Sequence, residues 1–156
     1  MMANIKDYSS IVGQAVIDEL FLLADKLKGK VIQNVNSTAV GGGVAEILSR
    51  MINLLRQLGV DARWDVIKGD EKFFNITKKM HNALHGVDVE VPLKELMYFQ
   101  EVNRQNAKEM DLCGDILFIH DLSQLPWLNR KRPWAKSGCG DVTLILLLPR
   151  KKLWLF

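Results

Sequence analysis

The chain has 156 residues, of which 48% are hydrophobic and 25% are charged, and its formal net charge is +3 at pH 7. This length suits a single domain with its own core, and the composition excludes a disordered or fibrous chain. It contains no apolar run near the ~20 residues that span a bilayer, no signal-peptide segment at its start, and too few cysteines for a disulfide framework. We therefore expect a cytoplasmic protein with no membrane partner.

The first half of the chain shows helix, strand and helix signals in turn. Apolar residues recur at helical spacing over 11–27, which predicts one helix with Ser9 and Ser10 as candidate caps. A β-branched run over 31–35 predicts a strand, and residues 44–58 predict a helix that ends before Gly59. The apolar positions of that helix, which we expect to be buried, are Ile47, Leu48, Met51, Ile52, Leu55 and Leu58.

The alternation continues through the second half. A strand is predicted over 61–67, helices over 71–85 and 93–110, and a last apolar strand over 116–119. Strands that alternate with helices predict an α/β fold, here a Rossmann-like parallel sheet with flanking helices. In such sheets, ligands bind beyond the carboxyl ends of the strands.

A run of three glycines, Gly41, Gly42 and Gly43, joins the first strand to its helix. Glycine reaches positive φ without strain and lets another molecule approach the backbone, and a helix start offers unpaired N–H groups to an anion or a polar ligand. The loop lacks the spacing of the dinucleotide fingerprint and the Gly-Lys-Ser/Thr of a P-loop. A ligand site is the favoured interpretation, and a tight turn without a ligand is the alternative.

Residues 122–156 differ from the rest of the chain. They contain seven basic residues and one acidic residue, whereas residues 1–121 carry a net negative charge. Within them, 142–148 has the composition of a strand, but 128–140 has no clear period. A basic, tryptophan-rich segment is one form of nucleic-acid patch. We expect no nucleic-acid partner, because an out-of-frame origin of this segment would account for its charge without one.

Three blocks of the sequence carry a family signal: 8–13 (Tyr-Ser-Ser-Ile-Val-Gly), 34–48 (beginning Asn-Val-Asn-Ser-Thr-Ala-Val-Gly-Gly-Gly-Val-Ala-Glu) and 118–121 (Phe-Ile-His-Asp). In order and spacing they resemble the N-terminal domain of trehalose glycosyltransferring synthases. These are retaining glycosyltransferases of the GT-B type, related to a group of trehalose phosphorylases. The resemblance covers residues 1–121, which it identifies as a partial, Rossmann-like, acceptor-side domain.

The resemblance implies an enzyme that transfers glucose from a nucleoside-diphosphate glucose to glucose, giving trehalose. The donor is a substrate, no cofactor is bound tightly, and the sequence lacks the Asp-x-Asp metal motif of the other glycosyltransferase class. The expected partners are the sugar acceptor and the nucleotide-sugar donor, with a homodimer as the expected assembly if the chain associates. Because the family's donor-binding domain is missing, we expect the isolated chain to be inactive. The alternatives are a stand-alone binding module and part of a trehalose phosphorylase.

The catalytic residues cannot be assigned from this sequence, but a substrate-binding set can. The resemblance implies that the glycine loop forms a backbone wall near the donor phosphates and the reacting sugars. Asp can accept a hydrogen bond from a sugar hydroxyl, and His can donate or accept one. The predicted residues are Gly41, Gly42, Gly43, Asn36, Ser37, Glu46, His120 and Asp121.

Some of these residues have structural alternatives. Asp121 could instead cap the segment that follows it, and Asn36 and Ser37 could shape the turn instead of binding sugar. Glu46 favours the helix dipole in any case. His81 and His85 have a metal-compatible spacing on a helix, but with no third ligand we expect a solvated helix face and no metal site.

The family continues after His-Asp with Pro-Gln-Pro and later with Trp-x-Trp-Arg-Cys-His-Ile-Asp, whereas this chain has Leu-Ser-Gln-Leu-Pro over 122–126. Read from the third base of each codon, residues 137–145 can encode Trp-Val-Trp-Arg-Cys-His-Ile-Asp. Our hypothesis is that residues 122–156 are out of frame after a single-base shift near codon 122. A genuine divergent C-terminal segment is the alternative.

The encoding DNA tests this hypothesis. Correcting one base near codon 122 should restore an open frame that contains the motif and continues into a second Rossmann-like half. If no single-base correction restores such a frame, the segment is a natural variant of this chain.

Overall fold

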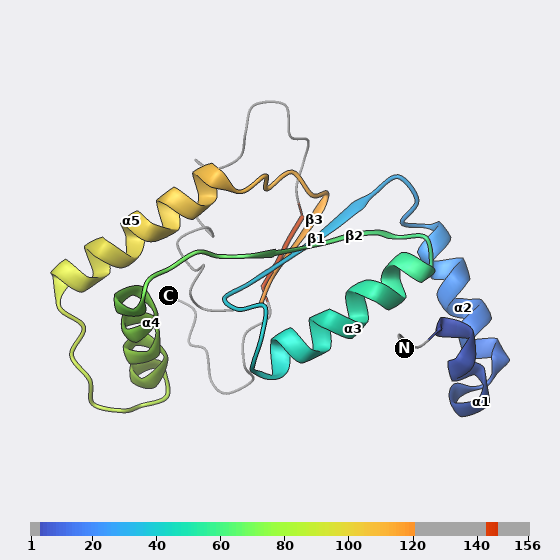
Figure 1. Ribbon diagram of the computed structural model, residues 1–156, viewed down its shortest axis with the longest axis horizontal. Coiled ribbons are helices and arrows are strands. Elements are labelled where there is room, and N and C mark those ends of the chain that lie inside the picture. The colour runs from blue at the N-terminus through green and yellow to red at the C-terminus, as the bar shows by residue number, and fades with distance from the viewer. Residues whose placement is uncertain (1–3, 121–142, 147–156) are drawn as a thin grey trace.

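The computed structural model describes residues 4–120 and the backbone of residues 143–146, and Figure 1 shows their arrangement. Four strands form one sheet in the order β2-β1-β3-β4. These strands are β1 (Val31–Asn36), β2 (Asp61–Val66), β3 (Ile116–Ile119) and β4 (Thr143–Leu146). Every neighbouring pair is parallel. The predicted α/β fold with a parallel sheet is therefore confirmed, and the strand expected within 142–148 is β4 at the sheet edge.

The helices fall into two groups along the chain. A short 3-10 helix η1 (Ile5–Tyr8), α1 (Ser9–Val12) and α2 (Gln14–Asp25) precede the sheet. The helix α3 (Gly43–Gln57) joins β1 to β2, while α4 (Glu71–Leu84) and α5 (Leu93–Glu109) lie between β2 and β3 in the chain.

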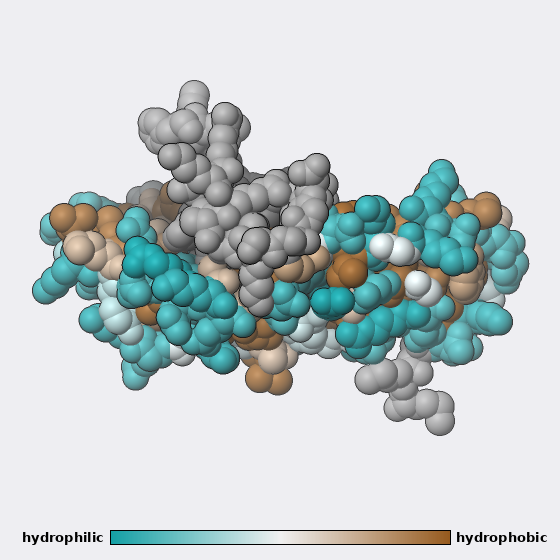
Figure 2. Space-filling view, turned by 90° about the horizontal axis from the view of Figure 1, so that it is seen from above, coloured by the Kyte–Doolittle hydropathy of each residue, from teal (hydrophilic) through white to brown (hydrophobic). Residues whose placement is uncertain are grey.

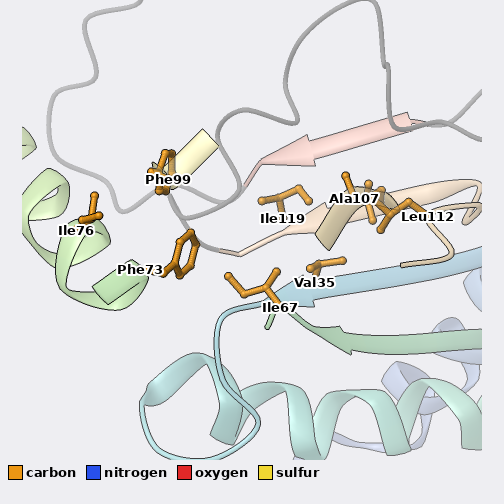
Figure 3. Packing of buried hydrophobic residues seen from close by; sticks show 9 residues of the cluster. Val35, Ile67, Phe73, Ile76, Phe99, Ala107, Leu112 and Ile119 are labelled. Carbon is orange, nitrogen blue, oxygen red and sulfur yellow. The ribbon is translucent and has the colours of Figure 1, made fainter. Parts of the chain in front are cut away.

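The sheet has a hydrophobic cluster on each face, because successive strand residues point to opposite sides. Leu117 and Ile119 of β3 join a cluster with Phe73 of α4 and Phe99 of α5, whose rings stack 5.6 Å apart (Figure 3). The alternate residues of β3, Ile116 and Phe118, pack against a second cluster on the other face of the sheet, which includes residues of α2 and of the end of α3. The buried members of this cluster are Ala24, Ile32 and Val60.

The predicted ends of two helices are confirmed at glycines. Gly59 follows α3 with φ +85°, its N–H donates to Arg56 O at 3.0 Å, and the Val60 N–H donates to Leu55 O at 3.0 Å. These two bonds form the Schellman motif, which needs a left-handed residue after the helix. Gly86 ends α4 with the same geometry, at φ +85°.

Two expectations from the sequence are wrong. The single helix over 11–27 is interrupted at Gly13, whose φ of 87° and ψ of 151° fit no helix, so Ser9 and Ser10 both lie inside α1 and neither caps α2. Ile47, predicted to be buried, is 63% exposed, whereas Leu48 and Ile52 are buried as expected. Met51, Leu55 and Leu58, also predicted to be buried, are half-buried. The sheet therefore covers a narrower face of α3 than the number of apolar residues in this helix suggests.

Buried amides hold the segments around the sheet. The Asn106 side chain on α5 accepts a hydrogen bond from Lys68 N at 2.7 Å and donates one to Lys68 O at 2.7 Å. It thereby binds the backbone of Lys68, just after β2, in the way that a neighbouring strand would. In β1, Gln33 donates to Asp111 O at 2.8 Å and accepts from Gly114 N at 3.1 Å. A Cβ on Gly114 would lie 2.7 Å from Gln33 Cβ, so this contact needs glycine.

Replacing Asn106 with the similarly sized Leu should destabilise the protein by about 1–3 kcal/mol, because it leaves the backbone groups of Lys68 without these bonds. Urea unfolding measures the change. Asn75→Leu, at an exposed position of α4, is the matched control and should change stability by no more than about 0.5 kcal/mol. Equal free energies of unfolding for the two variants would contradict the role given to Asn106.

Candidate sugar-binding edge of the sheet

The carboxyl ends of β1 and β3 lie side by side. Val35 pairs with Ile119 in the parallel register, and the His120 N–H extends the ladder by donating to Val35 O at 3.0 Å. The glycine loop leaves the end of β1 only a few residues later. The fold therefore brings two of the predicted site segments, separated by most of the chain, to the same edge of the sheet. Asp121, the next predicted residue, lies outside the described residues.

The imidazole of His120 is held by Asn34 from the neighbouring strand. The distance from His120 Nε2 to Asn34 Oδ1 is 2.9 Å, and Asn34 Nδ2 donates to Arg63 O at 3.4 Å. Because Asn34 turns its oxygen to the imidazole, and an amide oxygen only accepts, Nε2 carries the proton in this arrangement. In a neutral ring, Nδ1 is then a hydrogen-bond acceptor.

Burial also sets the charge of this ring. His120 is half-buried and lies over Phe118 with the ring centroids 6.2 Å apart. Loss of solvent around the imidazole lowers the pKa of His120 below its ordinary value of 6.5, because burial disfavours the charged form. His120 is therefore neutral at pH 7 and offers an acceptor to a hydroxyl group, one of the two roles expected from the sequence.

Asn36 ends β1 and is almost fully buried. Its Oδ1 accepts from Trp64 Nε1 at 2.7 Å, and its Nδ2 donates to Thr38 O at 2.7 Å. These bonds support the second of its two predicted roles, which is to shape the turn. Ser37 follows at a half-buried position. Sugar binding by Asn36 and Ser37 stays a prediction.

The segment after β1 is held in a tight local turn. The Thr38 hydroxyl donates to Val40 O at 2.6 Å and accepts from Val40 N at 3.2 Å. Gly41 and Gly42 then take φ values of 75° and 85°, which a residue with a Cβ adopts only with strain. The turn itself thus explains two of the three glycines.

Gly43 requires another explanation. It is the first residue of α3 and has no positive φ, and a Cβ placed there would meet none of the described atoms within 4 Å. Among the described residues no side chain caps α3, whose N-cap residue is Gly42. The first backbone N–H groups of the helix are therefore uncapped, and the space beside Gly43, where a Cβ would lie, holds none of the described atoms, as a close approach by a ligand requires.

Glu46 lies in the first turn of α3 and is exposed. Its backbone N–H donates to Gly42 O at 3.2 Å, which closes the first turn of the helix. A carboxylate here favours the positive end of the helix dipole. Contact between Glu46 and a sugar stays a prediction.

A polar group at the end of β2 was not predicted from the sequence. Asp70 caps α4 by accepting from Phe73 N at 2.8 Å, and it also accepts from Tyr98 Oη at 2.7 Å. The bond from Tyr98 lowers the pKa of Asp70 and raises that of Tyr98. Asp before an apolar helix signals a cap, but nothing local indicates that Tyr98 will reach it from α5.

The expected solvated face around His81 and His85 is confirmed, since both side chains are exposed. The two rings lie 4.2 Å apart, and His85 Nδ1 is 2.8 Å from His81 O. Among the described residues, no three His, Cys, Asp or Glu side chains form a group able to hold a metal. Over the same part of the chain, no helix has the length and apolarity needed to cross a membrane.

Comparison with known proteins assigns a family to this arrangement. A family model described as "Trehalose synthase, N-terminal domain" matches residues 34–137. The trehalose synthase of Pyrococcus horikoshii is 42% identical over 98% of this chain and 37% of its own length. The trehalose synthase of Thermococcus litoralis is 42% identical over 84% of the chain and 33% of its own length. The chain thus spans about a third of the length of these relatives.

Two further points come from the comparisons. A trehalose phosphorylase of Grifola frondosa is 36% identical over 56% of the chain and 12% of its own length. The family model ends at residue 137, and the match to the Pyrococcus protein covers 98% of the chain, so both run past residue 121. The boundary at 121 and the out-of-frame origin of the later residues stay predictions.

The burial of His120 predicts a pH dependence of stability. A histidine whose pKa is lower in the folded state takes up its proton first in the unfolded state, so stability should fall as the pH drops below about 6.5. The fall should level off once the pH is below the folded pKa.

His120→Gln keeps an N–H that can reach Asn34 but removes this titration. Urea unfolding between pH 5 and 7.5 should show a smaller loss of stability in the variant than in the wild type. His81 and His85 are present in both proteins and serve as the internal control. Parallel pH profiles for the two proteins would show that burial does not shift the pKa of His120.

Proposed function

Because this chain belongs to the family of trehalose synthase N-terminal domains, we propose that it forms the acceptor-side part of a retaining glycosyltransferase. The proposed reaction transfers glucose from a nucleoside-diphosphate glucose to glucose and gives trehalose. The observation that supports this proposal is the start of α3 at Gly43, which has no side-chain cap and lies at the same edge of the sheet as the neutral His120.

The chemistry of this transfer suits a backbone site. As the bond between the sugar and the diphosphate breaks, positive charge builds on the sugar and negative charge on the leaving diphosphate. Backbone N–H groups at the start of α3 lie at the positive end of the helix dipole and are fixed before the reaction, so they can stabilise that negative charge without rearranging. In this proposal the glycines at 41–43 allow the phosphates to come close.

The sugar-binding part of the proposal involves side chains around the loop. The Nδ1 atom of His120 accepts a hydrogen bond from a sugar hydroxyl, and Asp121 and Glu46 accept others through their carboxylates. Asn36 and Ser37 complete the edge from the end of β1. Holding the sugar in this way contributes to the rate by positioning it for attack.

Part of a trehalose phosphorylase is the second candidate, and the match to the Grifola protein favours it. A phosphorylase uses inorganic phosphate where a synthase uses a nucleotide. Titration with phosphate and with a nucleoside diphosphate therefore separates the two candidates. The more extensive matches to trehalose synthases favour the nucleotide.

The NMR spectrum of the labelled chain tests the proposed site. Titration with glucose or trehalose should shift the amide signals of Gly41, Gly42, Gly43 and His120 at millimolar ligand. Sorbitol at equal concentration is the control for nonspecific effects. Shifts confined to the opposite edge of the sheet, near Val31 and Asp61, would contradict the proposal.

Gly43→Ala separates a ligand role from a folding role. The substitution should leave stability unchanged or raise it by up to about 1 kcal/mol, because the backbone there suits Ala and nothing described fills the space. Affinity for a nucleoside diphosphate should nevertheless fall about tenfold or more, because the Cβ blocks close approach. Unchanged affinity in the folded variant would show that Gly43 has no ligand role.

A further inference from the structure

The glycine loop is not held in place by burial. Residues 39–43 are all exposed, and Val40, the largest side chain among them, is 83% exposed. On the face that Figure 2 shows, the described surface is mostly hydrophilic, with hydrophobic residues in small separate patches. The position of the loop therefore depends on hydrogen bonds made by the residues before it and on the helix that follows it.

These hydrogen bonds lead back to Trp64 on β2, a strand at the edge of the sheet. The half-buried indole of Trp64 donates through Nε1 to Asn36 Oδ1 at 2.7 Å, and Asn36 Nδ2 donates to Thr38 O at 2.7 Å. The Thr38 hydroxyl in turn bonds to both backbone groups of Val40, which Gly41 follows. A continuous series of side-chain hydrogen bonds thus connects the edge strand to the start of the loop.

The indole also decides which way the Asn36 amide faces. A tryptophan side chain can only donate, so it can bond to the oxygen of an amide and not to its nitrogen. Asn36 is 2% exposed, which leaves water little access to replace the indole as a donor. With its oxygen towards Trp64, the amide turns its nitrogen to Thr38 O. An amide turned the other way would lose both bonds.

The backbone of Asn36 has a separate support. Its carbonyl oxygen accepts from Ile67 N at 3.1 Å, and the carbonyl oxygen of Val35 accepts from His120 N at 3.0 Å. The end of β1 therefore stays in the sheet without the indole. Loss of the Trp64 N–H should disturb the turn and the glycines and leave the strands paired.

We propose that Trp64 is a positioning residue of the candidate site, whose indole N–H acts through Asn36 and Thr38 to hold the glycine loop in the conformation that receives a diphosphate. The ligand in this proposal rests on the proposed function, whereas the ordering of the loop does not. The alternative is that the Trp64 ring only packs on the sheet, and in that case its N–H has no effect on the loop.

Two substitutions of Trp64 in the 156-residue chain separate the N–H from the packing of the ring. Trp64→Phe keeps a large aromatic ring without a donor. Trp64→His has a smaller ring, but its Nε2 occupies the same place relative to Cγ as the indole nitrogen. At about pH 8 the imidazole is neutral, and Nε2 can carry the proton that Asn36 accepts. If packing alone mattered, the smaller His ring would do the greater harm.

Amide relaxation in the NMR spectrum measures the order of Gly41, Gly42 and Gly43 in the free protein. We expect the order to fall in Trp64→Phe and to stay close to that of the wild type in Trp64→His. Tyr98→Phe removes another aromatic donor, the one to Asp70, and is the matched control that should leave the loop unchanged. A loop of wild-type order in Trp64→Phe, or greater disorder in Trp64→His than in Trp64→Phe, would overturn the proposal.

Inorganic pyrophosphate, the group that all nucleoside diphosphates share, tests the link between loop order and binding. Its affinity, followed through the same glycine signals, should fall about tenfold in Trp64→Phe and less than about threefold in Trp64→His, because a misplaced binding group loses its contacts. Unchanged affinity in Trp64→Phe would overturn the positioning role. A wild-type loop that does not respond to pyrophosphate would instead contradict the proposed function, and the relaxation result would still decide whether Trp64 orders the loop.

Discussion

The need to satisfy buried amides in the central strand constrains the whole arrangement. Gln33, Asn34 and Asn36 of β1 are each at most 2% exposed, and a buried amide without partners would cost several kcal/mol at most sites. Each amide bonds to a different segment: Gln33 to the segment before β3, Asn34 to His120, and Asn36 to Trp64 and the turn. A strand that slipped by one residue would lose all of these bonds at once.

This constraint links folding to the candidate site. The same bonds that make the register of β1 unique also fix where its carboxyl end meets that of β3. His120 takes its orientation from Asn34, and the glycine loop begins at the turn that Asn36 holds. The site is therefore placed by the core of the sheet instead of by the loops alone.

Local patterns in the sequence predicted most of the fold. The strands, the later helices and the ends at Gly59 and Gly86 follow from periodicity and from glycines with a defined backbone need. The break at Gly13 was missed, because the apolar spacing continues across it. The exposure of Ile47 was missed because the period shows which residues share a helix face, not how wide a stripe the sheet covers.

The site was only partly predictable, for a different reason. The glycine loop is a local signal, but the bond between Asn34 and His120 joins residues 86 positions apart. Trp64 and Tyr98 reach their partners only through the tertiary arrangement of β2 and α5. The positive φ of Gly41 and Gly42 explains those glycines by folding alone, and only the structure distinguishes Gly43 from them.

The strand order also has a consequence for biosynthesis. β1 lies between β2 and β3, yet β3 is translated only after α3, β2, α4 and α5. On the ribosome, β1 can pair early with β2, but its other edge stays open until β3 emerges. The bonds of Gln33 to Asp111 and Gly114, and that of Asn34 to His120, cannot form before then. An open edge on a central strand is a template for pairing with other chains. Non-local parallel pairing of this kind is also slow, so the nascent chain should depend on chaperones most while α4 and α5 are being made.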